Sequence, residues 1–217
     1  MENSKNKIAV CIFGQTRTYK VFTNLYKNLN DQSDFSFDFF LTTWDDFKPN
    51  NKLDFFTETE YIKTDIFEFK NHTERAAYCI ARVNQLKLKH ELQGNFVYDY
   101  VVLARGEIEI NKEDLLSTLR DKCNNSSQYE INILSDIGVD KTGAWYQPSD
   151  FFSLGTSLAY DRYANSWKSY YRLEDGIDDK HGGHNFHAYA IKHNNLESKK
   201  VKIKHRFEFN QLKKREV

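Results

Sequence analysis

The fold class is decided by the stretch KIAVCIF at residues 7–13, a short continuous apolar run that stops at Gly14. Such a run is typical of a central strand that is buried on both faces of a sheet. Apolar residues then recur at helical spacing over residues 19–29, and the run FSFDFFLT at 35–42 predicts a second strand. A strand, a helix and another strand in this order predict the start of a parallel sheet.

The rest of the chain continues this alternation. Helical spacing over residues 73–92 predicts a long helix, and YDYVVLA at 98–104 predicts another buried strand. Weaker patterns predict strands at 65–69, 129–134, 150–157, 201–203 and 207–209, helices at 115–120, 160–171 and 186–191, and loops at 44–60 and 181–184. We therefore expect an α/β fold, built as a single domain of 217 residues.

Composition argues against several classes of protein. The 31 basic and 31 acidic residues give a net charge of zero, so the chain lacks the overall charge of a nucleic-acid binder. The cysteines have no paired spacing, which argues against a zinc site or a disulfide framework. No apolar run approaches the roughly 18 residues of a membrane span, and we expect a cytoplasmic protein. The basic residues at 199–204 and 213–215 predict a solvated surface, with peripheral contact to an anionic membrane as the alternative.

Three predicted loops, at 14–18, 42–46 and 105–109, each follow a predicted strand. If these strands are parallel, their carboxyl ends meet at one rim of the sheet, where α/β folds bind ligands. In the first loop, Gly14 allows the backbone to approach a ligand closely, and Gln15 offers amide hydrogen bonds. Arg17 can grip a phosphate through paired donors. An ordinary strand-to-helix turn with a surface arginine is the alternative interpretation.

The third loop carries alternating charges. On an extended chain Arg105, Glu107 and Glu109 share one face. Two carboxylates at this spacing can hold Mg²⁺ or Mn²⁺, and that cation would neutralise the diphosphate of a nucleotide-sugar as it departs. A half-buried strand with a solvated charged face has the same pattern, so both interpretations stay open.

Further candidates come from the loops and from the second rim segment. Asp150 precedes an apolar run and could act as a general base toward an acceptor hydroxyl, or cap a turn. His184, in the histidine cluster at 181–187, could complete a Mn²⁺ shell, or be a solvated loop histidine. Trp44 could stack on a base or sugar beside the carboxylate of Asp45, or belong to the core.

The order and spacing of these segments resemble a family of bacterial and viral glycosyltransferases for capsule or lipopolysaccharide synthesis, the WavE-like group. The resemblance runs from residue 7 to about 195 and rests on the blocks IAVCIFGQTRTY, DFFLTTWDD, YCIARVNQLKLKHE, YDYVVLARGEIEI, DFFSLGTSLAYDRY and HGGHNFHAYAIKHNNL. It implies a GT-A-like fold, a nucleotide-binding sandwich with a mostly parallel sheet flanked by helices. The nucleotide-sugar-binding half would occupy about 1–110, and the acceptor-side half with the basic tail about 111–217.

The resemblance also implies a reaction, in which a sugar passes from a nucleoside diphosphate-sugar to a glycan or lipid-linked acceptor. The resemblance strengthens the predicted sites at residues 14–17 and at Glu107 and Glu109. Together with the candidates from the residue patterns, the expected donor-binding residues are Gly14, Gln15, Arg17, Trp44, Asp45 and Arg105, the expected ligands of Mn²⁺ or Mg²⁺ are Glu107, Glu109 and His184, and the expected catalytic residue is Asp150.

The chain also departs from the family pattern at both acidic positions. The family has Arg-Pro-Asp where this chain has Arg105-Gly106-Glu107, and Pro-Glu where it has Gly183-His184. These changes favour the alternative of a non-catalytic nucleotide- or glycan-binding protein on the same scaffold. A nucleotidyltransferase, the third class, would need a glycine-rich basic phosphate loop near the N-terminus, where this chain has the single Gly14.

Overall fold

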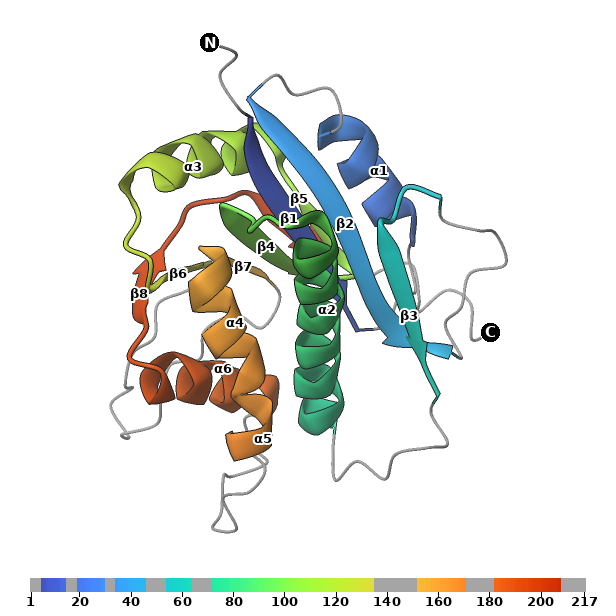
Figure 1. Ribbon diagram of the computed structural model, residues 1–217, viewed down its shortest axis with the longest axis vertical. Coiled ribbons are helices and arrows are strands. Elements are labelled where there is room, and N and C mark those ends of the chain that lie inside the picture. Colours follow the sequence, from blue (N-terminus) through green and yellow to red (C-terminus); the bar gives the residue numbers. More distant parts are fainter. Residues whose placement is uncertain are drawn as a thin grey trace.

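The computed structural model describes residues 5–14, 19–29, 34–45, 54–63, 72–134, 152–170 and 182–207. Its centre is a seven-stranded sheet in the order β3-β2-β1-β4-β7-β6-β8 (Figure 1). The strands are β1 (Asn6–Phe13), β2 (Phe35–Trp44), β3 (Glu58–Ile62), β4 (Tyr100–Arg105), β6 (Glu130–Ile133), β7 (Phe152–Gly155) and β8 (Glu197–Lys200). Neighbouring strands are parallel except at β7, which is antiparallel to both β4 and β6.

Helices cover both faces of this sheet (Figure 1). One face carries α1 (Tyr19–Leu29) and α3 (Lys112–Asn125), and the other carries α2 (His72–Gly94), α4 (Ser157–Asn165), α5 (Trp167–Tyr170) and α6 (Gly182–His193). The central strands are buried on both sides, so their alternate residues enter two separate cores. Ala9 and Cys11 of β1 pack with α2 and α4, while Ile8 and Val10 pack with α1 and α3.

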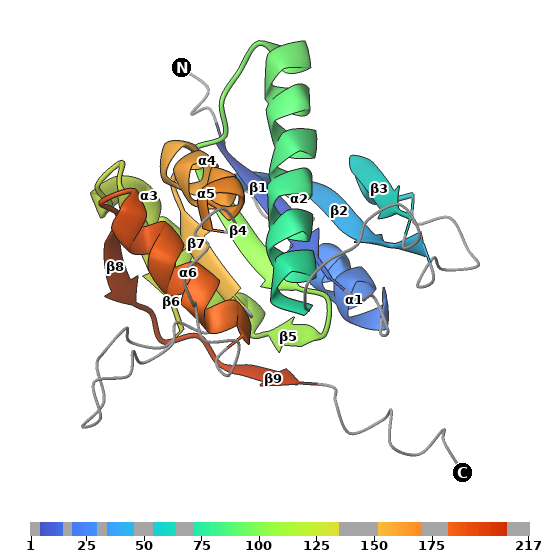
Figure 2. The same cartoon turned by 90° about the horizontal axis from the view of Figure 1, so that it is seen from below.

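A second, two-stranded antiparallel sheet lies beside the main one. It pairs β5 (Ile108–Ile110), which follows β4 after a two-residue turn, with β9 (His205–Phe207) near the end of the described chain. Figure 2 shows β5 and β9 together, beyond the end of β4. The pairing therefore brings the C-terminal part of the chain to the edge of the sheet where β4 ends.

Two helices on the C-terminal side begin with side-chain caps that their sequence supplies. Asn111 precedes α3, and its Oδ1 accepts a hydrogen bond from the backbone N–H of Asp114 at 3.0 Å. Thr156 precedes α4, and its Oγ1 accepts from the N–H of Ala159 at 3.3 Å. Such caps satisfy backbone donors that the first turn of a helix leaves without partners.

The expected class is confirmed: the fold is α/β, with a mostly parallel sheet between helical layers. Several element boundaries were wrong. The segment 44–60, expected as a loop, contains the end of β2 and most of β3, and the expected strand at 201–203 is replaced by β8, which ends at Lys200. The expected loop at 181–184 contains the start of α6 instead. The predicted strand at 65–69 lies outside the described residues. Within the described residues, no helix combines the length and the apolarity that a membrane crossing requires.

Candidate functional site

The predicted rim exists. Strands β2, β1 and β4 are adjacent and parallel, and Phe13 lies opposite both Thr42 and Arg105. The backbone continues these pairings past the strand ends, because the N–H of Gly14 donates to the Thr42 carbonyl at 3.2 Å and the N–H of Gly106 donates to the Phe13 carbonyl at 3.2 Å. The strand ends at Gly14, Trp44 and Arg105 therefore meet at one edge, as the parallel sheet predicts.

Gly14 occupies a backbone conformation that favours glycine. Its φ is +89°, and a Cβ atom built on it would have no heavy atom of the described residues within 4 Å, so among these residues open space lies where a side chain would stand. Behind it, the buried Cys79 thiol of α2 lies in hydrogen-bonding reach of the Gly14 backbone. Burial raises the pKa of Cys79 to about 12 despite that hydrogen bond, so this thiol is protonated at neutral pH in the protein as described.

Arg105 and Glu107 form an ion pair immediately after β4. Nη2 of Arg105 lies 2.9 Å from Oε2 of Glu107, and the two side chains are 27% and 5% exposed. The chain turns at Gly106 and Glu107 before β5 begins, so residues 105–109 are not one extended face. The expectation that Arg105, Glu107 and Glu109 alternate along one strand is therefore wrong: the turn places Glu107 against Arg105, and only Glu109 lies in the middle of β5.

A metal site was expected at Glu107, Glu109 and His184. Within the described residues, no group of three or more His, Cys, Asp and Glu side chains has an arrangement that could hold a metal ion. Glu107 is almost completely buried and bound to Arg105, which differs from the open carboxylate that a divalent cation needs. Glu109 is half-buried opposite Arg206 of β9. The side chain of His184 lies outside the described residues, so the metal site stays a prediction.

Trp44 lies at the rim, on the side that faces the core. Its side chain is 5% exposed and packs in the core with α2, and the guanidinium of Arg75 lies 5.6 Å from its ring centroid. Asp45 follows it and is exposed. Arg75 is a rim cation that the sequence analysis missed, although its place in the first turns of the helix that follows β3 gave a usable signal, because such helices begin at the rim in this type of fold.

Several candidates cannot be placed. Gln15, Arg17 and Asp150 lie outside the described residues. His184 lies in the first turn of α6, but its side chain is outside what the structure describes. The roles assigned to these four residues stay predictions.

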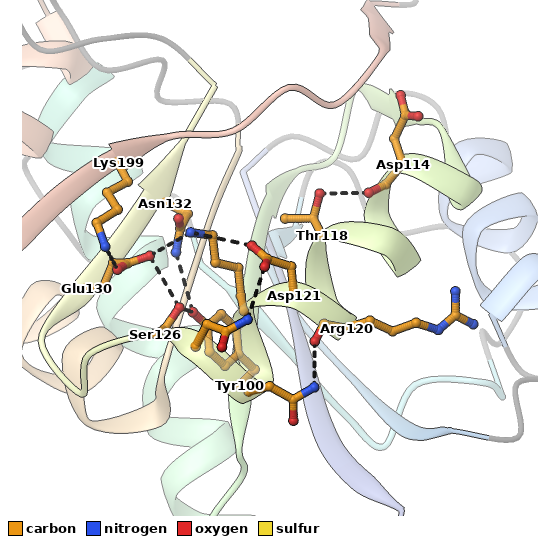
Figure 3. Close-up of polar contacts among 12 residues, drawn as sticks. Tyr100, Asp114, Thr118, Arg120, Asp121, Ser126, Glu130, Asn132 and Lys199 are labelled. Atoms are coloured by element: carbon orange, nitrogen blue, oxygen red, sulfur yellow. Dashed lines mark hydrogen bonds and ion pairs between the residues drawn. The ribbon is translucent and has the colours of Figure 1, made fainter.

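The opposite edge of the sheet carries a polar cluster around Glu130, the first residue of β6. Its carboxylate is fully buried, accepts hydrogen bonds from Lys122 at 3.0 Å and from Ser126 at 3.2 Å, and pairs with Lys199 of β8 (Figure 3). The hydroxyl of Tyr100 in turn donates to Ser126 at 2.6 Å. Burial acts to raise the pKa of Glu130, but the hydrogen bonds from the two lysines outweigh it, and the pKa is lowered below its ordinary value.

A second cluster lies on the other face, around a fully buried lysine. Nζ of Lys87 pairs with Glu91 at 3.1 Å and with Asp161 at 2.9 Å, and contacts the hydroxyl of Ser157. Burial raises the pKa of Asp161, although Lys87 opposes this shift. No local pattern in the sequence predicts either cluster, because each joins residues from separate elements. Glu130 begins β6, while Lys87 and Asp161 lie in α2 and α4, so neither cluster includes a residue predicted for the site.

Comparisons with known proteins do not identify a family for this chain. No family description and no curated protein matches the chain. One similar solved structure is a CMP:2-keto-3-deoxy-manno-octonic acid synthetase in complex with CTP, 10% identical, covering 97% of this chain and 96% of that one, with a TM-score of 0.44. Another is a putative glucose-1-phosphate thymidylyltransferase from Bacillus anthracis in complex with sucrose, 12% identical, covering 97% and 93%, with a TM-score of 0.47. At these TM-scores neither similarity supports a function, and the WavE-like resemblance stays a prediction.

Proposed function

We propose that this chain is a glycosyltransferase that moves a sugar from a nucleoside diphosphate-sugar to a hydroxyl of a glycan or lipid-linked acceptor. The observation that carries the proposal is the position of the Arg105–Glu107 pair beside Gly14, at the edge where β1 and β4 end. A held guanidinium next to a backbone with open space in front of it suits an anionic diphosphate. The order of the sequence blocks supports the same reaction class.

In this proposal the rim holds the donor. Gln15 and Arg17 bind the nucleotide and its phosphates, Asp45 binds a donor hydroxyl, and Trp44 supports the rim from below. Arg105 stabilises the negative charge that grows on the diphosphate as it leaves. Preorganised charge of this kind is commonly the largest single contribution to an enzyme's rate enhancement.

The proposed transfer needs no reactant other than the nucleotide-sugar donor, the acceptor hydroxyl and the general base. The acceptor oxygen forms a bond to the anomeric carbon, and the bond from that carbon to the diphosphate oxygen breaks. Its electron pair leaves with the diphosphate, and the proton of the acceptor hydroxyl goes to Asp150 as general base.

A divalent cation is a separate part of the proposal. If Mn²⁺ or Mg²⁺ binds, Glu109 and His184 are its ligands, with Glu107 joining only if it releases Arg105. The cation would supply additional positive charge near the diphosphate. The basic end of the chain provides the surface for a peripheral contact with a membrane that carries a lipid-linked acceptor.

The second candidate is a protein that binds a nucleotide or glycan without catalysis. The pairing of Glu107 with Arg105 favours it, because it occupies the carboxylate that a metal-dependent enzyme would use. Fold similarity alone does not separate the two cases.

A donor screen by mass spectrometry distinguishes the glycosyltransferase from the non-catalytic binding protein. The full chain is incubated with UDP-, GDP- and ADP-sugars, with and without Mn²⁺, and with mixed glycan acceptors. A parallel incubation contains nucleoside triphosphates and sugar phosphates. Release of nucleoside diphosphate with formation of a glycosylated product supports the transferase. Binding of a nucleotide-sugar without turnover supports the second candidate, and release of diphosphate from a nucleoside triphosphate and a sugar phosphate would assign nucleotidyl transfer instead.

A further inference from the structure

Several side chains at the rim project from the same face of the sheet. Residues that lie opposite one another on neighbouring strands share a face, and Phe13 lies opposite Thr42 of β2 and Arg105 of β4. Trp44 comes two residues after Thr42 on the same strand, so it projects to the same side. Phe13 and Trp44 both pack in the core that α2 covers. Arg105 therefore belongs to the α2 side of the sheet.

The first turns of α2 bring a second guanidinium to that side. The central carbon of the Arg75 guanidinium lies 5.6 Å from the ring centroid of Trp44, within the range of a cation–π contact. Cys79 lies one turn further along α2, on the same face of the helix as Arg75, and its thiol is in hydrogen-bonding reach of the Gly14 backbone. The stretch of α2 that carries Arg75 therefore covers the rim beside Gly14.

The contact with Trp44 is compatible with binding of an anion by Arg75. Stacking on an aromatic ring uses the flat face of a guanidinium, whereas a phosphate is bound by the N–H donors at its edge. The ring also restricts a long side chain in advance, which reduces the entropy that is lost when a ligand binds. Glu107 holds Arg105 in a comparable way, at 2.9 Å.

We infer that Arg75 is a second phosphate-binding residue of the rim, and that the diphosphate of the donor lies on the α2 side of the sheet between Arg75 and Arg105. This inference rests on the proposed function of the rim as a donor site. Strands β2 and β4 flank β1, so they lie about 10 Å apart. Two arginine side chains that reach toward each other over this distance can each bind one phosphate of a diphosphate.

The hydroxyl of Thr42 adds a polar group on the same side. Thr42 is fully buried, and its Oγ1 has no hydrogen-bond partner in the part of the chain that the structure describes. Buried hydroxyls without a partner are uncommon in proteins. An anion bound on this side of the rim would give the hydroxyl an acceptor.

Two arginines predict a preference for diphosphates. A nucleoside monophosphate offers its charge to one of the two guanidinium groups at a time, whereas a diphosphate engages both. The wild type should therefore bind a nucleoside diphosphate at least about tenfold more tightly than the matching monophosphate, the scale of one charged hydrogen bond. Arg75→Ala should remove most of this preference.

Calorimetric titration of the full chain with UDP, GDP, ADP and CDP, and with the matching monophosphates, tests the inference. Arg75→Ala should weaken diphosphate binding about 10- to 100-fold and monophosphate binding less than about threefold. The matched control is Arg162→Ala, which removes a guanidinium that lies 4.5 Å from the ring centroid of Tyr129. Tyr129 directly precedes β6, at the edge of the sheet where β4 begins. Circular dichroism of both variants checks that they are folded.

The outcomes separate this inference from the proposed function. If Arg75→Ala binds like Arg162→Ala while Arg105→Ala weakens binding, the inference is overturned and the proposed donor site stands. An equal loss for diphosphates and monophosphates also overturns the inference, because Arg75 would then support the rim as a whole rather than bind the second phosphate. A wild type that binds none of these nucleotides contradicts the proposed function, and the inference fails with it.

Discussion

The guanidinium of Arg105 lies 2.9 Å from the carboxylate of Glu107, across the turn that follows β4. The carboxylate is buried and the guanidinium is partly exposed, so the pair has a fixed inner member and an outer member that faces solvent. An arginine has five N–H donors in a planar fork, a geometry that matches phosphate as well as carboxylate. Glu107 is therefore a positioning residue for Arg105 in our account, and this differs from the metal-ligand role that the sequence suggested.

Glu107 could act by positioning Arg105 or by binding a metal ion, and these two roles predict different results in a double-mutant cycle of Glu107 and Arg105. If Glu107 acts through Arg105, Glu107→Gln should weaken nucleoside diphosphate binding about three- to tenfold in the wild-type background and have no further effect in Arg105→Ala. Residues of one ion pair show this non-additivity. Calorimetry on the four proteins of the cycle measures it, with Glu113→Gln, an exposed acid on α3, as the control. Additive losses that appear only with Mn²⁺ would instead identify Glu107 as a metal ligand.

The backbone at Gly14 predicts a specific cost for a side chain. Gly14→Ala should lower the free energy of unfolding by about 1–2 kcal/mol, since φ is +89° there and residues with a Cβ adopt that region at a cost. The loss cannot come from crowding, because nothing lies within 4 Å of the new Cβ. Gly14→Asn is the control and should lose less, because asparagine tolerates positive φ. Urea unfolding measures both, and an unchanged midpoint for Gly14→Ala would refute the assigned conformation.

Two lysines lie two residues apart on α2, and their substitution should lower the free energy of unfolding by very different amounts. Lys87→Met should cost about 3–5 kcal/mol, because it leaves the buried Glu91 and the partly exposed Asp161 without their cation. Lys89→Met should cost about 0–1 kcal/mol, since Lys89 is 57% exposed in its pair with Glu58. Thermal and urea unfolding compare the two variants. Equal losses would contradict the buried position of Lys87.

Much of the scaffold was predictable because its signals are local. The apolar run before Gly14 and the helical spacing of α2 each lie within one element, and parallel strands then bring Gly14 and Arg105 to one edge. The antiparallel direction of β7 and the pairing of β5 with β9 depend on partners far along the chain, which no local pattern specifies. The turn at Gly106 was missed because alternation across residues 105–110 has the same pattern as a continuous strand.

The cluster around Glu130 predicts a pH dependence of stability. Because hydrogen bonds from Lys199 and Lys122 lower the pKa of Glu130 in the folded chain, its carboxylate stabilises the fold at neutral pH. This contribution is lost as pH falls below the ordinary value of 4.5 toward the folded pKa. Glu130→Gln should therefore destabilise by about 2 kcal/mol at pH 7, the scale of a hydrogen bond to a charged group.

The destabilisation of Glu130→Gln should shrink as the pH is lowered through that range. Urea unfolding at a series of pH values from neutral to acidic measures it for both proteins. A difference that stays constant down to the lowest pH would contradict a titrating carboxylate at this position.

The central claim is that the rim beside Gly14 binds a nucleoside diphosphate through Arg105. Calorimetric titration of the full chain with UDP, GDP, ADP and CDP, each with and without Mn²⁺, tests it most directly. We expect one of them to bind, and we expect Arg105→Ala to weaken that binding about 10- to 100-fold, the loss of a charged hydrogen bond. Arg120→Ala, which removes an exposed guanidinium paired with Asp34, should bind like the wild type. Absence of binding under every condition, or equal affinity in the Arg105 and Arg120 variants, would contradict the account.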